Sequence, residues 1–362
     1  MVDRAAVHDA VAAIVDPDLR RSLSELGMLR EVSVEDDGGV RVGLAAPIPA
    51  WDLAPIEQAI TDAAKTVPGV KDVAVDGAIM AEAECDALAA RLKADHPSRP
   101  GGAGSRTRVI TVASGKGGVG KSSVSANLAV ALARAGTDVA VLDADVWGYS
   151  IPGMLGMERP PAAVGELIVP PQAHGVRVIS MDFFVAPDQA VVWRGPMLHK
   201  ALEQFLDDVF WDEPEFLLLD LPPGTGDVAI SLSQFLPAAQ GLVVTTPQIT
   251  AQRVARRAAL MSQQVNQEVL GVVENMSWFT GDDGKQYPIF GEGGGEALAE
   301  DLGVPLLGRI PLIPALRIGA DEGIPVAVSA PGSEAAEAFD ALADRLVETL
   351  PRVRRPPELV IE

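Results

Sequence analysis

The sequence is short of cysteine and of basic residues. Cys85 is the only cysteine among 362 residues, which excludes a disulfide within one chain and a metal site built from several cysteines of one chain. Lysine and arginine together number 29, against 50 aspartates and glutamates, and the net charge is −21. This surplus of negative charge predicts repulsion from nucleic acid and from anionic membrane surfaces, so neither is expected as a partner.

Long hydrophobic runs are also missing. The first ten residues contain no apolar core of the kind that a secretory signal needs. The longest uncharged stretch, residues 228–252, is interrupted by glutamines, threonines and prolines and is not expected to span a membrane. The composition, with 48% hydrophobic and 22% charged residues, is that of an ordinary globular protein. We therefore expect a cytoplasmic location.

One segment divides the chain into two parts. Residues 95–107 contain prolines and glycines but no large apolar side chain, which predicts a flexible linker. It would separate a small domain, residues 1–94, from a large domain, residues 108–350, and a proline-rich tail would follow over residues 351–362. Two domains agree with the length of the chain at about 150 residues per domain.

The pattern of the small domain predicts a compact α+β unit. Helices are expected near residues 3–15 and 56–67, and strands over residues 31–35, 40–44 and 70–75. An acidic turn that ends in two glycines joins the first two strands, which is a hairpin signal.

The large domain alternates short apolar strands with helices. The strands are rich in valine, isoleucine and leucine without polar alternation, as a parallel sheet covered on both faces requires. They are expected over residues 109–113, 139–142, 176–180, 216–219, 241–245, 269–273 and 306–310. Helices are expected over residues 121–134, 198–210, 250–265 and 333–350. This order predicts an α/β fold with a doubly wound, mostly parallel sheet.

A phosphate-binding motif follows the first strand of the large domain. Residues 115–122 fit the pattern G-x-x-x-x-G-K-[ST], and a helix is expected to begin there. Glycines allow the backbone to wrap around a phosphate, and the helix N-terminus adds positive charge. Lys121 is expected to bridge the β- and γ-phosphates of ATP, and Ser122 to hold Mg²⁺.

Two more strands of this domain end in acidic residues. In open parallel sheets, ligand-binding residues gather at the carboxyl ends of the strands. Asp220, at the end of one strand, is expected in the second shell of the Mg²⁺, and the backbone N–H of Gly224 is a candidate contact to the γ-phosphate. Asp143 and Asp145 end another strand, either as capping acids of a loop or as general base and metal-shell residues.

The same residues carry a resemblance to a known family. A second lysine, Lys116, follows the first glycine of the motif, and this form resembles the deviant Walker-A class that contains MinD, ParA and the nitrogenase iron protein. Within that class, the chain resembles the Mrp-type ATPases, which are bacterial iron–sulfur cluster carriers. The stretches that carry this likeness are residues 143–152, 194–197, 220–227, 273–277 and 305–311. Residues 1–95 resemble the small domain of metal–sulfur assembly proteins that often precedes this ATPase, with residues 16–19 and 25–28 carrying the likeness.

The resemblance implies roles for individual residues. Lys116 would reach the nucleotide of the opposite subunit in a homodimer, Asp145 would orient or activate the attacking water, and Asn275 would contact the adenine. Lys116, Lys121 and Asp145 are thus the expected catalytic residues, and Ser122 and Asp220 the Mg²⁺ residues. The expected nucleotide-binding residues are Gly115, Lys116, Gly117, Gly118, Val119, Gly120, Lys121, Ser122, Ser123, Gly224 and Asn275.

The sequence departs from this family at the site of its cargo. The carriers bind their cluster through a C-x-x-C pair after the stretch that corresponds to residues 275–277, and neither cysteine is present here. The small domain usually has a cysteine in the segment that corresponds to residues 46–51, which also has none. Iron–sulfur clusters need thiolate ligands, and Cys85 lies in an alanine-rich helical stretch that predicts a packed thiol.

Three functions follow from these observations. The first is a homodimer that hydrolyses ATP and, as the family implies, carries iron–sulfur clusters to client apoproteins, although the cysteine ligands of the cluster are absent from this sequence. The second is an ATP-dependent scaffold that binds cargo without a cluster. The third is a positioning switch of the MinD or ParA kind, which needs a basic amphipathic tail, whereas residues 351–362 contain three prolines.

Overall fold

The computed structural model describes residues 2–95, 99–146, 148–185, 195–224, 227–248, 251, 254–256, 259 and 267–350. They form two compact units. The small unit comprises Met1–Pro97 together with Pro161–Pro170 and Asp208–Phe210, and the large unit comprises the rest of the chain.

The small unit is built on a sheet of three strands in the order β1-β2-β3. β1 (Leu29–Val34) is antiparallel to β2 (Gly39–Ala46), and β2 is parallel to β3 (Asp72–Ile79). Its helices are α1 (Arg4–Ala12), α2 (Leu23–Leu26), α3 (Ala54–Lys65) and α4 (Glu82–Asp95). The α+β class predicted for this part of the chain is confirmed.

A short hairpin from the middle of the chain completes the small unit. β6 (Ala162–Val164) pairs with β7 (Leu167–Val169), and Val164, Leu167 and Val169 belong to the same hydrophobic cluster as the buried side chains of α4. Leu167 is only 4% exposed. The sequence analysis did not predict this hairpin, because strands of three residues show no measurable periodicity.

Truncation of Leu167 tests this packing. We expect Leu167→Ala to lower the free energy of unfolding by about 2–5 kcal/mol, because it leaves a cavity in a close-packed core. Urea unfolding followed by circular dichroism measures the loss. Glu166→Gln, at the exposed neighbouring position, is the control and should stay within about 0.5 kcal/mol of the wild type. Equal stability of both variants would contradict burial of the hairpin.

The large unit contains an eight-stranded sheet in the order β15-β12-β11-β4-β10-β5-β9-β8. Neighbouring strands are parallel except for β8, which is antiparallel to β9. The strands are β4 (Arg108–Ser114), β5 (Val139–Asp143), β8 (Gln172–Ala173), β9 (Val176–Ser180), β10 (Phe216–Asp220), β11 (Gln240–Thr245), β12 (Val269–Glu274) and β15 (Leu306–Arg309). The mostly parallel sheet predicted from the sequence is therefore confirmed.

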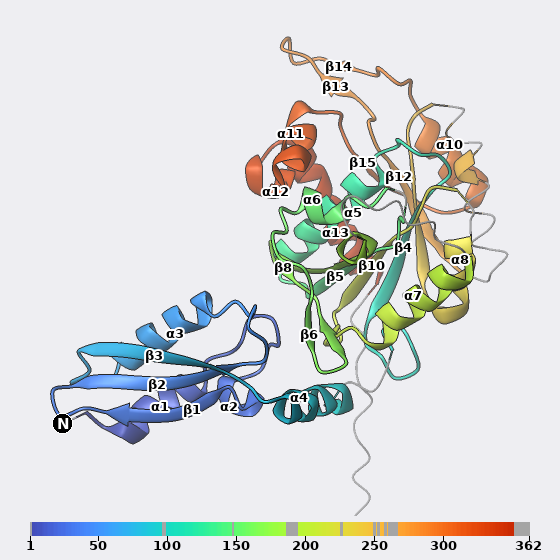
Figure 1. Cartoon of the computed structure of the whole chain (residues 1–362). Helices are drawn as coiled ribbons and strands as arrows, with labels where there is room; N and C mark the ends of the chain where they lie inside the picture. The colour runs from blue at the N-terminus through green and yellow to red at the C-terminus, as the bar shows by residue number, and fades with distance from the viewer. Residues whose placement is uncertain are drawn as a thin grey trace, which may run out of the picture. The chain divides into compact units, whose positions relative to one another are not determined.

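Helices cover both faces of this sheet (Figure 1). Along β11, Leu242 and Val244 contribute to one hydrophobic cluster with α5 (Lys121–Arg134) and α13 (Glu334–Thr349), whereas Val243 contributes to another with α10 (Gly294–Leu302). Successive side chains of a strand point to opposite faces, so each face has its own core. The helices are α5 (Lys121–Arg134), α6 (Ile151–Met154), the 3₁₀ helix η1 (Met181–Phe184), α7 (Gly195–Asp207), α8 (Asp227–Phe235), α10 (Gly294–Leu302), α11 (Pro314–Glu322), α12 (Val326–Ser329) and α13 (Glu334–Thr349).

One predicted helix has a different end in the structure, and two predicted segments lie mostly or wholly outside the described residues. Helix α7 ends at Asp207, three residues before the expected end, because Asp208 and Phe210 form backbone hydrogen bonds with Ile168 of the hairpin. Most of the helix expected over residues 250–265 and the whole tail, residues 351–362, lie outside the described residues. Among the described helices, none is long and apolar enough to cross a membrane.

The predicted linker is partly ordered against the large unit. Arg99 forms an ion pair of 2.6 Å with Asp207, Arg106 forms one of 2.9 Å with Glu213, and Pro100 is buried. The boundaries expected for the two domains stay a prediction, because residues 161–170 and 208–210 belong to the small unit although they lie far from it in the sequence.

Candidate nucleotide-binding site

The glycine-rich motif forms the loop between β4 and α5, at the carboxyl ends of the parallel strands. Every residue of β4 is buried, so the strand is fixed in the sheet, and α5 begins at Lys121 with Gly120 as its N-cap. The loop borders a cavity of about 480 Å³. Its lining residues are Ser114, Lys116, Gly117, Gly118, Val119, Gly120, Lys121, Ser122, Ser123, Asp145, Gly148, Ser150, Met154, Pro222 and Pro223.

Gly120 is required by both its conformation and its surroundings. Its φ of 79° lies in the left-handed region, and a Cβ at this position would lie 2.2 Å from Nδ2 of Asn275. The Asn275 amide donates a 2.9 Å hydrogen bond to the Val119 carbonyl. Asn275 therefore fastens the loop from outside the cavity lining, and its expected contact with adenine stays a prediction.

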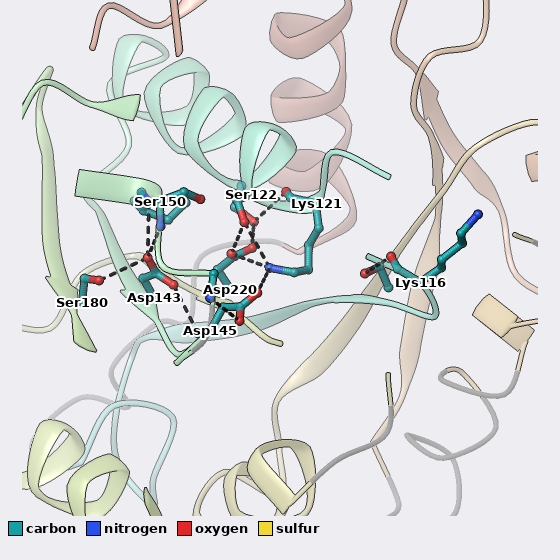
Figure 2. A network of polar contacts seen from close by, with 12 residues as sticks. Lys116, Lys121, Ser122, Asp143, Asp145, Ser150, Ser180 and Asp220 are labelled. Atoms are coloured by element: carbon teal, nitrogen blue, oxygen red, sulfur yellow. Dashed lines mark hydrogen bonds and ion pairs between the residues drawn. The ribbon is translucent and has the colours of Figure 1, made fainter. Parts of the chain in front are cut away.

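The charged residues below the loop form one compact cluster (Figure 2). Lys121 Nζ lies 2.5 Å from Asp220 Oδ2, and the Ser122 hydroxyl donates to the same oxygen at 2.7 Å. The other oxygen of Asp220 accepts a 2.5 Å hydrogen bond from the hydroxyl of Ser125. Lys121 and Asp220 are 6% and 0% exposed. An ion pair removed from water in this way is strongly coupled, because little solvent screens it.

Asp145 joins this cluster from the next strand end. Its Oδ2 lies 3.8 Å from Lys121 Nζ, and its Oδ1 accepts a 3.1 Å hydrogen bond from the N–H of Gly148. Asp145 is 7% exposed and lines the cavity. The structure thus brings together Lys121, Ser122, Asp145 and Asp220, all of which were predicted as site residues.

Asp143 is placed differently from Asp145, two residues further along. Its side chain is completely buried, and both of its oxygens accept hydrogen bonds from neighbouring groups of the protein. Burial raises the pKa of Asp143 to about 7, and the negative charge of Asp220 acts in the same direction. Of the two interpretations left open by the sequence, the structure supports a capping acid, although in a buried rather than an exposed position.

Lys116 lies apart from the other charged groups. It is exposed at the cavity rim, and in Figure 2 its side chain points away from Lys121 and Asp220. Its carbonyl accepts a 3.2 Å hydrogen bond from the hydroxyl of Ser114, which fixes the backbone while the ammonium group extends into solvent. The two lysines of the motif are therefore in opposite environments.

Gly115 and Gly224 do not line the cavity. A Cβ on Gly115 would lie 2.1 Å from the backbone of Val254, so this glycine allows close packing. The N–H of Gly224 donates a 2.9 Å hydrogen bond to the carbonyl of Ser114. A contact with a γ-phosphate would require this N–H to exchange its present partner.

Three serines were missed by the sequence analysis: Ser125, Ser150 and Ser180. Ser125 follows Lys121 by four residues, and this helical spacing could have identified it. Ser150 and Ser180 bind Asp143 from a loop and from the neighbouring strand. No local pattern marks Ser180, because its contact depends on how the strands are ordered in the sheet.

The donor set of the cluster fits a magnesium ion. Mg²⁺ prefers oxygen ligands, and the hydroxyl of Ser122, which lines the cavity, lies 2.7 Å from the buried carboxylate of Asp220. The carboxylates of Asp145 and Asp220 face a single buried ammonium group, so an additional cation would balance the local charge.

The region that would hold an iron–sulfur cluster is built from other residues. Gly281, Asp282, Asp283 and Gly284 form the tip of the hairpin between β13 (Phe279–Thr280) and β14 (Gln286–Tyr287). Asp283 accepts a 2.9 Å hydrogen bond from the hydroxyl of Tyr287. In the part of the chain that the structure describes, no group of three or more histidine, cysteine or acidic residues is arranged to hold a metal ion.

Cys85 is the remaining thiol. It is buried in α4, and its Sγ donates a 3.1 Å hydrogen bond to the carbonyl of Pro47. Burial and the acidic neighbours Asp86 and Glu84 raise the pKa of this thiol. A thiol with a raised pKa is a poor metal ligand at neutral pH, which agrees with the packed thiol predicted from the sequence.

Two known family models match parts of this chain. Residues 105–347 match the family model described as NUBPL iron-transfer P-loop NTPase, of the ParA type, and residues 4–76 match that of the iron–sulfur cluster assembly protein. The chain belongs to the NUBPL iron-transfer P-loop NTPase family. The resemblance stated from the sequence is thereby confirmed.

Relatives of this P-loop NTPase align over almost its whole length. The protein of Mycobacterium leprae named iron–sulfur cluster carrier protein is 46% identical over 353 residues, covering 95% of this chain and 92% of the relative. The Escherichia coli K12 protein of the same name is 40% identical over 352 residues, with 96% and 92% covered.

Solved structures share the P-loop NTPase fold. A nucleotide-binding protein from Archaeoglobus fulgidus in complex with ADP has a TM-score of 0.54 and 36% identity, covering 60% of this chain and 87% of that one. The cell division ATPase MinD from Pyrococcus furiosus has a TM-score of 0.51 and 28% identity, covering 67% and 99%.

Proposed function

We propose that this P-loop NTPase binds and hydrolyses ATP as a homodimer. The observation that carries the proposal is the cluster of Lys121, Ser122, Asp145 and Asp220, of which the first three line the cavity and Asp220 is completely buried against Lys121 and Ser122. It provides a cation for the phosphates, oxygen ligands for Mg²⁺ and a carboxylate placed to orient water.

Each member of the cluster has a separate task. Lys121 would leave Asp220 and contact the β- and γ-phosphates, while the N–H groups at the start of α5 bind the phosphate oxygens. Ser122 and Asp220 would hold Mg²⁺, which neutralises negative charge on the phosphates when bound. Asp145 lines the same cavity and would accept a hydrogen bond from the attacking water.

The homodimer is inferred from Lys116. An exposed lysine at the cavity rim that points away from its own cluster is available to a nucleotide in a second subunit. Dimerisation over the two cavities would also exclude water from the phosphates, which strengthens every charge interaction there.

Mixing two inactive variants tests whether Lys116 of one subunit acts at the nucleotide site of the other. Lys116→Ala and Asp145→Asn are each expected to hydrolyse ATP very slowly as homodimers. In a mixed dimer, the subunit that keeps Asp145 receives Lys116 from its partner, so one complete site forms. Random pairing gives about a quarter of the wild-type rate per total subunit in a 1:1 mixture.

The mixing experiment has a clear alternative outcome. If Lys116 acted within its own subunit, mixed dimers would contain no complete site and the mixture would stay inactive. Analytical ultracentrifugation with ATP and Mg²⁺ establishes whether dimers form. A mixture that forms dimers but shows no recovery contradicts the shared site.

The relatives are named as carriers of iron–sulfur clusters. The residues of this chain do not fit a cluster that is held by thiolates. Cys85 is its only cysteine and is buried against Pro47. This observation favours the second candidate function, an ATP-dependent scaffold that contacts client apoproteins of cluster assembly without holding the cluster in a C-x-x-C pair.

Anaerobic reconstitution with iron and sulfide distinguishes the two functions. A scaffold should show no visible-region absorption after removal of free iron and sulfide, and Cys85→Ser should behave in the same way. A stable chromophore in the wild type that is lost in Cys85→Ser would instead favour a carrier with two Cys85 thiolates from a dimer.

A further inference from the structure

The loop that carries Asp145 is organised around one buried side chain. Asp143 lies at the end of β5, and in the sheet it is paired in register with Asp220 of β10 on one side and with Ser180 of β9 on the other. The chain then leaves the sheet, passes Asp145 and Gly148, and enters α6. Asp143 is thus the last residue of the strand from which this loop begins.

The two oxygens of Asp143 have separate sets of donors. Oδ1 accepts a hydrogen bond of 3.2 Å from the N–H of Asp145. Oδ2 accepts from the N–H groups of Ser150 and Ile151, at 3.1 and 3.3 Å, and from the hydroxyl of Ser180 at 3.2 Å. One carboxylate therefore binds the start of the loop, its end and the neighbouring strand (Figure 2).

Asp143 is not placed to touch the substrate. It is completely buried and does not line the cavity, whereas Asp145 and Ser150 do. The side chain of Asp145 contacts Lys121 at 3.8 Å and the N–H of Gly148 at 3.1 Å. Because the backbone carries the side chain, the hydrogen bond from the N–H of Asp145 to Asp143 contributes to the placement of the Asp145 carboxylate.

We propose that Asp143 is a positioning residue, which binds the backbone of Asp145 through one oxygen and closes the loop at Ser150 and Ile151 through the other. This inference rests on the proposed ATP hydrolysis for its effect on rate. It predicts that the two oxygens serve different steps: Oδ1 supports hydrolysis by placing Asp145, and Oδ2 supports nucleotide binding by placing the cavity wall.

Asp143→Asn separates the two oxygens. The asparagine has a single oxygen, which is expected to turn toward the three donors at Ser150, Ile151 and Ser180. Its amide group then faces the N–H of Asp145, where two donors meet without an acceptor. We expect kcat to fall about 10-fold, while KM and the affinity for ADP stay within about threefold of the wild type.

Two further variants accompany it. Ser180→Ala removes one donor from the Oδ2 side and leaves the contact with Asp145, so kcat should stay within about twofold of the wild type. Asp143→Ala removes both sets of contacts and should impair ADP binding as well as kcat. Isothermal calorimetry measures the affinity for ADP, and steady-state kinetics measures kcat, so the two effects can be compared for each variant.

Hydrogen exchange provides a readout that does not depend on ATP hydrolysis. In the nucleotide-free protein, Asp143→Asn should lose protection at the amide of Asp145 and keep it at Ser150 and Ile151, as measured by NMR. Equal loss at all three amides, or none, would overturn the proposal even if the wild type hydrolysed ATP normally. A wild type without ATPase activity would refute the proposed function, and the exchange pattern would still decide the role of Asp143.

Discussion

Replacing Lys121 with alanine should lower the affinity for Mg-ATP by about 100-fold or more and abolish measurable hydrolysis. The lysine is 6% exposed at the cavity floor, and its Nζ lies 3.8 Å from Asp145 and 2.5 Å from Asp220. Loss of a desolvated charge partner in a binding site costs about 3 kcal/mol, which corresponds to a factor of more than 100 in the dissociation constant. Calorimetric titration with ATP and Mg²⁺ measures it.

The same substitution should also destabilise the nucleotide-free protein. Asp220 is completely buried, and among the residues that the structure describes its side chain would keep the hydroxyls of Ser122 and Ser125 as partners. Breaking a buried ion pair by removing one member costs about 3–5 kcal/mol. A lower melting temperature is therefore expected, and binding must be measured well below it.

Lys116→Ala is the matched control for Lys121→Ala. Both lysines belong to the same loop, but Lys116 is exposed and extends into solvent. Its truncation should leave the melting temperature unchanged and the binding of ADP within about threefold. If Lys121→Ala bound Mg-ATP as tightly as the wild type, the assignment of the cavity to a triphosphate would be wrong.

The sheet could be predicted from the sequence because burial on both faces leaves a strong pattern. Strands such as Val139–Asp143 and Phe216–Asp220 are short, wholly apolar runs that end in an acid, and they begin and end within a residue of the expected limits. The ends of these strands then fixed the position of the site, because parallel strands place their carboxyl ends at one edge.

Features that depend on contacts distant in sequence could not be predicted. Residues 161–170 follow the pattern of neither a long helix nor a long strand, and only the hydrophobic cluster of the small unit shows where they belong. The role of Asp143 was left open for a similar reason. A carboxylate at a strand end is suited to catalysis or to capping, and its neighbours Ser180 and Ile151 decide between the two.

Asp145→Asn should separate binding from hydrolysis. Asparagine has nearly the same shape as aspartate, and its side-chain oxygen can still accept the hydrogen bond from Gly148. It lacks the negative charge and the basicity that an attacking water requires, so kcat should fall by about 100-fold or more. The affinity for ADP should change less than about threefold, because the phosphates are held by Lys121 and the glycine-rich loop.

Single-turnover hydrolysis and calorimetry with ADP together test this separation. Glu158→Gln is the control, since Glu158 is an exposed acid of the same region that does not line the cavity. A fall in kcat and in affinity by the same factor would mean that Asp145 supports the cavity rather than the water. Unchanged hydrolysis would contradict the role of Asp145 in activating the attacking water.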